Sequence, residues 1–419
     1  MLIYKYRVMN KVGIAMLVMF SILFFSCEKD DEISFSDVSV GLKLPKSLTK
    51  KKPVLNSAKL VMTNVNTGVE TIEQLTTLQS PVVNVEDGLY NLLVTGELNC
   101  TTTDTKGKTI NQTIKVRGVK ENLEVVGGEL DVDMSLFIFK ESTGFVISEI
   151  FFARTKTPEG QIYNSGDQYF EIYNNSSEVL YADGLCIAQT ALNSAQKMDK
   201  FKPDIRNVAT PVSDVYRIPG SGKDYPVQPG ESIVICDVAI NHKTDNPNSF
   251  DLSKADFEWY DEKGNEVDVP EVTNMVKIAS TSASSWRINM WGWQSYILFK
   301  MEDVTSKAFL KDYAYHYEYL FVHEDFRITM EFDAWKVPNS NIIDAVECSS
   351  RSGFKWKALD PSLDLTWTHS GDGNEETYGK SVKRKVSHVT ADGRKVLLDT
   401  NDSAFDFIPT AVPSPFVIE

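Results

Sequence analysis

Short apolar segments separated by polar turns run through almost the whole 419-residue chain. Between residues 33 and 140 they recur at a spacing of about ten residues, and apolar positions alternate with polar ones at Leu42/Leu44 and Leu92/Val94. Alternation places the apolar side chains on one face of a strand, and short strands at this spacing are typical of β-sandwiches. Residues 34–140 are therefore predicted to form one sandwich domain.

A second region, residues 144–419, begins with predicted strands at Phe145–Phe152 and Tyr169–Tyr173 and a third apolar segment at Gly184–Ile187. A further strand is predicted over Tyr225–Cys236, with a turn at Pro229-Gly230. The following segment is rich in loops and contains one predicted helical turn, at Ser253–Trp259. We interpret residues 238–340 as an insertion in this second domain.

Aromatic residues are concentrated in residues 285–335. A strict alternation over Tyr313–Phe321 predicts a strand with five aromatic side chains on one face, and Trp291 and Trp293 flank Gly292 so that a strand would place both on one face. Such a face either fills a core or forms an exposed platform for a planar ligand, a sugar or a protein partner. The platform hypothesis assigns ligand or partner binding to Trp291, Trp293, Tyr313, Tyr315, Tyr317 and Tyr319.

The chain starts with basic residues, followed by the 14-residue apolar run Val12–Phe25. This run is shorter than the ~20 residues that span a bilayer and is typical of a signal peptide, here residues 1–26. Small Ser26 and then Cys27 follow it. This arrangement resembles a bacterial lipobox, which implies acylation of Cys27 and anchoring in the outer membrane.

Residues 27–33 are strongly charged and contain Lys29, Asp30, Asp31 and Glu32. They resemble the acidic export tag of Bacteroidota surface lipoproteins, which implies display on the cell surface. The alternative is a solvated linker.

The formal net charge is −15, and removal of residues 1–26, which hold three basic and no acidic residues, leaves −18. Binding to nucleic acid depends on positive charge, so nucleic acid is excluded as a partner. The other four cysteines, Cys100, Cys186, Cys236 and Cys348, are widely spaced and show no disulfide framework, although two disulfides are possible. Most are expected to be small buried residues.

Three motifs resemble ligand sites but are incomplete. Gly379-Lys380-Ser381 ends like a phosphate-binding loop, but Asn374 stands where the first glycine is required. The segment Asp372–Glu376 has the alternating oxygens of a calcium loop and lacks its glycine and its final glutamate. Asp237, His242 and Asp245 supply only one imidazole, which is too few for zinc. No metal and no cofactor is therefore predicted.

Glu149 and Glu171 lie on two predicted strands that can be neighbours, and paired carboxylates are the catalytic groups of glycosidases. The alternative is a pair of hydrogen-bonded structural glutamates. The chain lacks a G-x-S-x-G motif and has five histidines, which leaves little capacity for general-base catalysis. We therefore do not predict an enzyme.

The beginning and the end of the second region together resemble the lamin-tail-like domain, an immunoglobulin-type sandwich. The matching residues are Ile147, Ser148, Glu149, Phe170, Glu171, Ile172, Tyr173, Asn174, Gly184 and Leu185, and near the end Ser381, Arg384, Asp406, Phe407, Pro409, Pro413 and Pro415. The resemblance implies structural roles for both glutamates. In the first region, VEDGLYNLLVTG resembles a strand of transthyretin-like modules.

The predicted fold class is thus all-β, with a transthyretin-like or immunoglobulin-like sandwich followed by an expanded lamin-tail-like one. The whole chain resembles Bacteroidota outer-membrane lipoproteins that accompany TonB-dependent transporters. This resemblance implies an accessory role in nutrient capture, with iron or haem as candidate ligands and the transporter as the expected partner. A structural or adhesive protein and a carbohydrate-binding lipoprotein are the alternatives.

Overall fold

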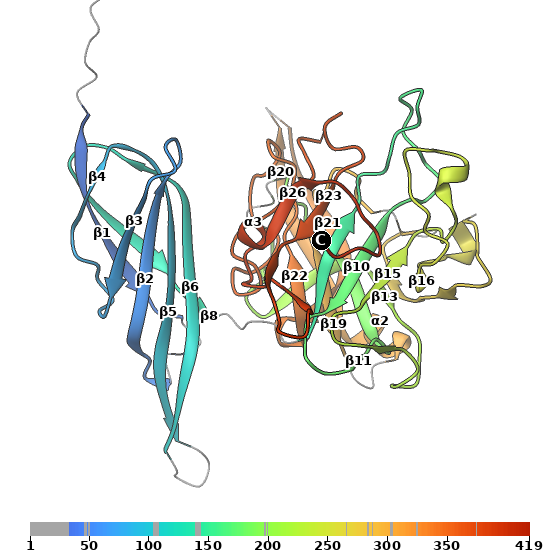
Figure 1. Cartoon of the computed structure of the whole chain (residues 1–419), viewed down its shortest axis with the longest axis horizontal. Coiled ribbons are helices and arrows are strands. Elements are labelled where there is room, and N and C mark those ends of the chain that lie inside the picture. The colour runs from blue at the N-terminus through green and yellow to red at the C-terminus, as the bar shows by residue number, and fades with distance from the viewer. Residues whose placement is uncertain are drawn as a thin grey trace, which may run out of the picture. The chain divides into compact units, whose positions relative to one another are not determined.

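The computed structural model describes residues 33–45, 48, 51–103, 109–138, 144–196, 198, 200–264, 266–282, 285–286, 288–301, 305–323, 326–373 and 375–419. The protein is nearly all β, which confirms the predicted fold class (Figure 1). The predicted signal peptide, Cys27 and the charged residues Lys29, Asp30, Asp31 and Glu32 lie outside the described residues. In the part of the chain that is described, no helix is long and apolar enough to cross a membrane.

Two sheets contain the strands of the first region. One has the order β4-β1-β7 and the other the order β3-β2-β5-β6-β8. Buried and exposed positions alternate along β1, where Val38, Val40 and Leu42 are buried, so the alternation at Leu42 does mark a core face. The strands are β1 (Phe35–Lys43), β2 (Val54–Asn64), β3 (Glu70–Leu75), β4 (Val83–Glu86), β5 (Gly88–Thr103), β6 (Thr109–Val125), β7 (Glu129–Ser135) and β8 (Phe137–Ile138).

Two larger sheets contain most strands that follow residue 144. Their orders are β17-β16-β15-β10-β9-β23-β26 and β20-β21-β13-β12-β19-β22, with β18 paired to β13. The strands are β9 (Phe145–Phe151), β10 (Tyr169–Asn174), β11 (Leu180–Tyr181), β12 (Leu185–Thr190), β13 (Ala209–Arg217), β14 (Pro226–Val227), β15 (Ser232–Cys236), β16 (Phe257–Glu258), β17 (Thr273–Asn274), β18 (Val276–Ser280), β19 (Tyr296–Lys300), β20 (Ala314–His323), β21 (Phe326–Pro338), β22 (Ile342–Val346), β23 (Ser381–Arg384), β24 (Val386–Val389), β25 (Lys395–Leu397) and β26 (Phe407–Ala411).

The helices in the described part of the chain are short. They are α2 (Ser306–Asp312), α3 (Ser403–Asp406) and the 3-10 turns η2 (His242–Thr244), η3 (Glu262–Gly264) and η4 (Asn339–Asn341). The Thr305 side chain caps the N-terminus of α2 and that of Asp402 caps α3, as expected for these residue types.

One apolar core joins the two larger sheets. It contains Ile147 and Phe170 from one sheet and Ile187, Tyr216 and Leu298 from the other. Because both sheets contribute their alternate side chains, this part of the chain is a sandwich. Cys100, Cys186, Cys236 and Cys348 are all free and buried, as expected from their spacing.

The first and last strands of this sandwich are neighbours. Strand β23, red in Figure 1, pairs with β9, and Lys383 of β23 is in register with Glu149 of β9. Strand β26 pairs with β23 and forms the edge of the sheet. The closing run of the sequence is therefore part of the sheet.

The predicted helical turn at Ser253–Trp259 is wrong. Phe257 and Trp259 are buried, and the Asp256 carboxylate accepts a hydrogen bond of 2.8 Å from the Val234 amide. These contacts hold the segment extended, so that β16 pairs with β15 in parallel. Residues 238–340 supply strands to both large sheets. The domain boundaries themselves stay predictions.

Candidate recognition site

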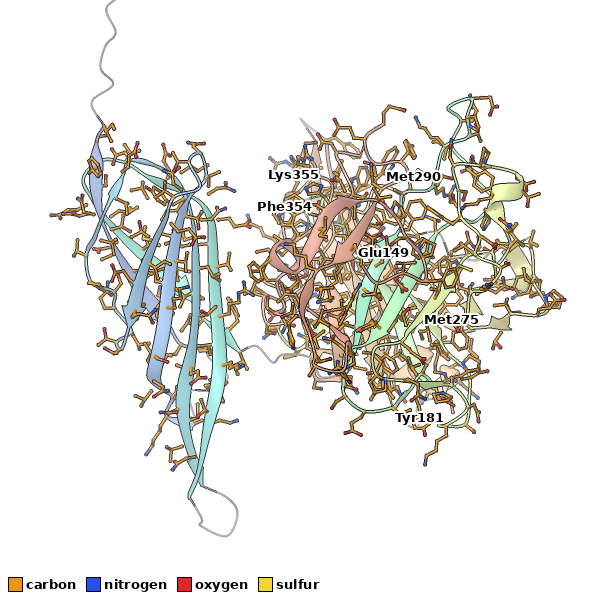
Figure 2. The ribbon with its side chains drawn as sticks, in the orientation of Figure 1. Glu149, Tyr181, Met275, Met290, Phe354 and Lys355 are labelled. Carbon is orange, nitrogen blue, oxygen red and sulfur yellow. The ribbon has the colours of Figure 1, made fainter. Side chains whose placement is uncertain are left out.

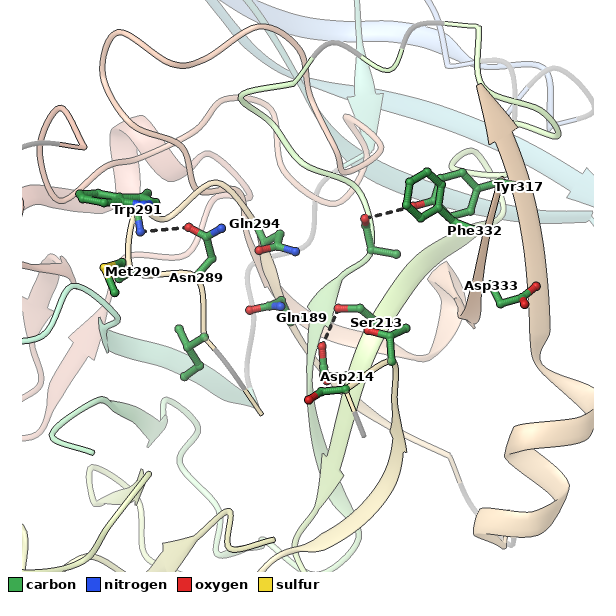
Figure 3. A pocket seen from close by; sticks show the side chains of 14 residues that line it. Gln189, Ser213, Asp214, Asn289, Met290, Trp291, Gln294, Tyr317, Phe332 and Asp333 are labelled. Atoms are coloured by element: carbon green, nitrogen blue, oxygen red, sulfur yellow. Dashed lines mark hydrogen bonds between the residues drawn. The ribbon is translucent and has the colours of Figure 1, made fainter. Parts of the chain in front are cut away.

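A cavity of about 530 Å³ opens at residues of the second large sheet and one turn beside it (Figure 3). It combines aromatic side chains with amides, hydroxyls and carboxylates, a mixture that is typical of small-molecule sites. Strands β12, β13, β20 and β21 and the segments 281–282 and 288–294 provide the lining, which comprises Gln189, Ala191, Ser213, Asp214, Thr281, Ser282, Ile288, Asn289, Met290, Trp291, Gln294, Tyr317, Phe332 and Asp333.

Trp291 is held at this cavity by a tight turn. The Asn289 side-chain Oδ1 accepts a hydrogen bond of 2.9 Å from the Trp291 amide, and the Gly292 amide donates to the Asn289 carbonyl oxygen at 2.9 Å. Asparagine is favoured at the start of such turns because its side chain imitates a backbone acceptor. The turn replaces the strand that we predicted for Trp291 and Trp293, since Gly292 has a φ of +65°.

Gly292→Ala should destabilise the protein by about 2–5 kcal/mol, because left-handed backbone costs roughly 1–2 kcal/mol and overpacking roughly 1–3 kcal/mol. A Cβ at this position would lie 2.5 Å from Cζ of the buried Phe152. Gly379→Ala is the matched control, because Gly379 has a similar φ of +68° with open space around it. Urea unfolding followed by tryptophan fluorescence gives both values. Equal losses in the two variants would contradict the packing argument.

The two tryptophans are half-buried and packed on each other. Their ring centroids are 6.4 Å apart at an interplanar angle of 29°, and the Tyr378 ring lies edge-to-face with Trp291 at a centroid distance of 5.9 Å. The indole Nε1 of Trp293 donates to Ser350 Oγ at 3.1 Å. Trp291 lines the cavity, whereas Trp293 packs on the Trp291 ring and is not part of the lining.

The tyrosines of β20 fill a core and do not form an open platform. Tyr315, Tyr317 and Tyr319 are 6%, 2% and 5% exposed and pack with Phe201 and other apolar residues, while half-buried Tyr313 stacks on Phe309. This confirms the core interpretation of the alternation. Of the four tyrosines, Tyr317 also lines the cavity.

Aromatic rings from β20 and β21 form a wall of the cavity opposite Trp291 (Figure 3). Tyr317 and Phe332 are register partners, and their ring centroids are 5.3 Å apart at 18°. The Tyr317 hydroxyl donates to the Ala191 carbonyl oxygen at 3.3 Å. This wall is thus fixed to the neighbouring chain segment.

Polar side chains lie between the two aromatic walls. Gln189 and Asp214 are register partners on β12 and β13, and both are buried. The hydroxyls of Ser280 and Ser213 donate to the two Asp214 carboxylate oxygens at 2.6 and 2.7 Å. Burial raises the pKa of Asp214, and these two hydrogen bonds oppose the rise.

Gln189 Oε1 is buried and has no hydrogen-bond partner among the described residues. Unpaired buried polar atoms are rare and costly, so this amide is open to a water molecule or to a ligand group that enters the cavity. Gln189, Asp214 and Gln294 were not among the site residues predicted from the sequence. The available signal was a polar residue inside each of the buried strands LCIAQT and ATPVSDVYR.

The Glu149 and Glu171 pair is structural. The two residues are register partners on β9 and β10, and Glu149 lies within the sheet (Figure 2). Glu149 accepts a hydrogen bond of 2.5 Å from Ser381 Oγ, and Glu171 accepts one of 2.7 Å from Ser232 Oγ. Both carboxylates are less than 2% exposed, so neither is presented to a substrate.

Stability should rise by about 1–3 kcal/mol between pH 8 and pH 5, since one pKa unit corresponds to ~1.4 kcal/mol. Burial raises the pKa of Glu171 to about 7, and the Glu149 carboxylate adds to the rise. In the folded protein Glu171 therefore takes up a proton below about pH 7, whereas in the unfolded chain the same carboxylate stays ionised down to about pH 4.3. Urea unfolding at pH 5, 6.5 and 8 measures this, and Glu171→Gln should remove the share of the rise that Glu171 contributes while leaving that of other buried carboxylates such as Asp364, whose pKa burial raises to about 7. A stability maximum at pH 8 would exclude stabilisation by protonation of Glu171.

The incomplete ligand motifs have structural partners. Ser381 is fully buried in β23, and His242 contacts Tyr163 Oη at 3.1 Å through Nδ1 and the Val238 carbonyl oxygen at 2.9 Å through Nε2. The Asp372 carboxylate accepts a hydrogen bond of 2.5 Å from the Ser352 amide. The residues that the structure describes include no group of three or more His, Cys, Asp or Glu side chains that could hold a metal ion.

Residues 228–414 match the family model of DUF4876, described as a protein of unknown function. A crystal structure of a DUF4876 family protein from Bacteroides thetaiotaomicron is 20% identical, with a TM-score of 0.52 over 90% of this chain and 96% of that one. This likeness shows the fold. The shared fold is an all-β sandwich. The lamin-tail-like and lipoprotein assignments stay predictions.

Two further solved structures are more distant. A candidate adhesin from Bacteroides ovatus is 11% identical, with a TM-score of 0.19 over 73% of this chain and 84% of that one. A candidate cell adhesion protein from Bacteroides eggerthii is 9% identical, with a TM-score of 0.17 over 71% and 78%. Scores this low do not establish a shared fold. No curated protein matches the chain.

Proposed function

We propose that this protein is a non-catalytic binding protein of the cell exterior that recognises its ligand in the cavity beside Trp291. The observation that carries the proposal is the placement of a rigid tryptophan, a tyrosine–phenylalanine wall and an unsatisfied buried amide around one opening. Rigid aromatic groups with a few polar groups give a site both affinity and orientation.

Adhesion or capture fits this site better than catalysis. The glutamate pair that has glycosidase chemistry is closed inside a sheet, and Asp214 is held by two serine hydroxyls. Among the sequence-based hypotheses, capture of iron or haem beside a TonB-dependent transporter has no support from the comparisons. We therefore favour an adhesive or ligand-binding role at the cell surface.

Location at the surface rests on two predictions, the lipid anchor at Cys27 and the charged export tag that follows it. Cys27→Ala should move the protein from the membrane fraction to the soluble fraction, because the thioether lipid needs the Cys27 thiol and stable anchoring needs more than one acyl chain. Fractionation and immunoblotting measure this. Wild-type amounts in the membrane fraction would show that the anchor is elsewhere.

Adherence tests the proposed function. Cells that display the full chain are washed over immobilised mucin and over envelope fragments of other bacteria, and the retained cells are counted. Trp291→Ala with Gln294→Ala should reduce retention to the level of cells without the protein. Trp367→Ala is the control, because Trp367 is half-buried against Phe354 and does not line the cavity. Full retention by the cavity variant would overturn the proposal.

A further inference from the structure

Among the described residues that line the cavity, Asp214 contributes a buried carboxylate. The Asp333 side chain is 93% exposed and bonds His316 at 2.9 Å, and no lysine or arginine is among the described lining residues. An anionic ligand would lose its hydration and meet like charge, which is unfavourable. The lining therefore selects against phosphates, sulfates and carboxylates, including acidic sugars.

The amides in the cavity favour a ligand with many hydroxyl groups. The Gln189 amide carries an unsatisfied acceptor, and rotation about its last bond presents either its oxygen or its nitrogen to the opening. Asn289 uses its Oδ1 within the turn, so its Nδ2 remains as a donor. Because each hydroxyl both donates and accepts, neighbouring hydroxyls of one molecule can satisfy such groups in pairs.

Asp214 adds a strong acceptor. Each of its oxygens receives one serine hydroxyl and keeps capacity for a second hydrogen bond. A hydroxyl bonded to a carboxylate is held more strongly than one bonded to a neutral acceptor. An apolar ligand would instead leave Gln189 and Asp214 without partners, and sites of this kind reject ligands that lack the matching groups.

Trp291 supplies the face for stacking. The π-face of an indole carries negative potential, which attracts the weakly positive C–H groups on one side of a sugar ring. Trp293 and Tyr378 pack against Trp291, so the ring is held before a ligand arrives. Preorganised rings lose little entropy on binding.

From these features we infer that the cavity binds an uncharged saccharide, with Trp291 stacking on a sugar ring and Gln189, Gln294 and Asp214 bonding its hydroxyls. This inference rests on the proposed function and adds the ligand class to it. The cavity volume of about 530 Å³ lies within the ~300–1,000 Å³ of typical small-ligand pockets.

The test measures binding of the detergent-purified full chain to an array of neutral oligosaccharides (glucans, mannans, galactans and xylans) and to sialylated, sulfated and uronic-acid glycans in the same buffer. Calorimetry then gives Kd for the best ligand. A neutral glycan should bind, and Trp291→Ala and Gln294→Ala should each weaken it at least tenfold. Trp367→Ala should leave Kd within about twofold.

The outcomes separate this inference from the proposed function. Preference for acidic glycans, or binding that Trp291→Ala and Gln294→Ala leave unchanged, would overturn the saccharide site. If no glycan binds while the cavity variants still lose adherence, the saccharide class is wrong and the binding function stands. If adherence is also independent of the cavity, both fail. Near-ultraviolet circular dichroism of each variant shows whether it is folded, and Gln294→Glu provides a variant that keeps the side-chain size.

Discussion

Deleting residues 399–419 should abolish the cooperative unfolding transition of the second sandwich. Strand β26 pairs with β23 at the edge of a seven-stranded sheet, and its Phe407 is 1% exposed. Burial of one such side chain is worth roughly 1.5–3 kcal/mol, and the deletion also removes the Asp399 and Asp406 carboxylates that surround buried Arg384. Together with the lost strand pairing, this approaches the ~5–15 kcal/mol net stability of a whole domain.

Tryptophan fluorescence is a specific probe for this experiment. All seven tryptophans lie between residues 259 and 367, so the signal reports the second region and not residues 34–140. A shorter deletion, residues 412–419, keeps β26 and removes the contacts of Lys383 with Ser414 and Glu419. It should lower the melting temperature but preserve the transition. A native-like tryptophan transition in the longer deletion would show that β26 is dispensable.

Most of the fold could be predicted because it follows from local patterns. Apolar runs placed β9 and β10 to within one residue, and the strict alternation in Tyr313–Phe321 located β20. The turn at Gly230, with φ +83°, followed from Pro229-Gly230. In each case the side-chain period of a strand, or the conformational freedom of glycine, determines the local structure by itself.

The predictions failed where distant contacts decide the structure. The segment Trp291–Trp293 alternates like a strand, but Asn289 closes a turn over it and Gly292 fits only against Phe152. Phe152 is far from this segment in sequence, so the pattern could not reveal that contact, whereas Asn289 is a local turn signal two residues before Trp291 that the prediction of a strand passed over.

The polar part of the candidate site was missed for the same reason. Gln189 and Asp214 are neighbours only through the pairing of β12 with β13, and each alone is an ordinary polar residue in an apolar strand. The unpaired oxygen of Gln189 and the raised pKa of Asp214 both result from burial, which cannot be read from the sequence. The aromatic signal, by contrast, was visible, although three of the four predicted tyrosines proved to belong to a core cluster.

A cluster of buried charges joins the beginning of the second sandwich to its end. The Arg384 side chain is 1% exposed and contacts Asp344 at 2.7 Å, Asp399 at 3.1 Å and Asp406 at 3.8 Å. Its Nε also donates to the Ile147 carbonyl oxygen at 2.8 Å. Burial raises the pKa of Asp344 to about 7 in spite of the arginine, so these carboxylates depend on their single shared cation.

Arg384→Met should therefore destabilise the protein by at least 3–5 kcal/mol at pH 8, the usual loss when one partner of a buried ion pair is removed. Methionine keeps most of the volume, so the loss reports charge more than packing. Without the guanidinium, the buried carboxylates bind protons more readily in the folded state than in the unfolded chain, where their pKa is about 3.9. The loss of stability in Arg384→Met relative to wild type should accordingly become smaller as the pH falls from 8 to 5.

Arg384→Lys should lie between wild type and Arg384→Met, because lysine restores the charge but not the planar fork that reaches several carboxylates. Arg206→Met is the control: its partner Asp204 is 45% exposed, so this pair should contribute about 1 kcal/mol or less, to which the loss of its hydrogen bond to the Lys357 carbonyl oxygen and of its packing over Trp356 adds. Urea unfolding by tryptophan fluorescence at pH 5 and pH 8 compares all three. If Arg384→Met loses no more than Arg206→Met, or loses more at pH 5 than at pH 8, the buried charge cluster does not hold the sandwich closed.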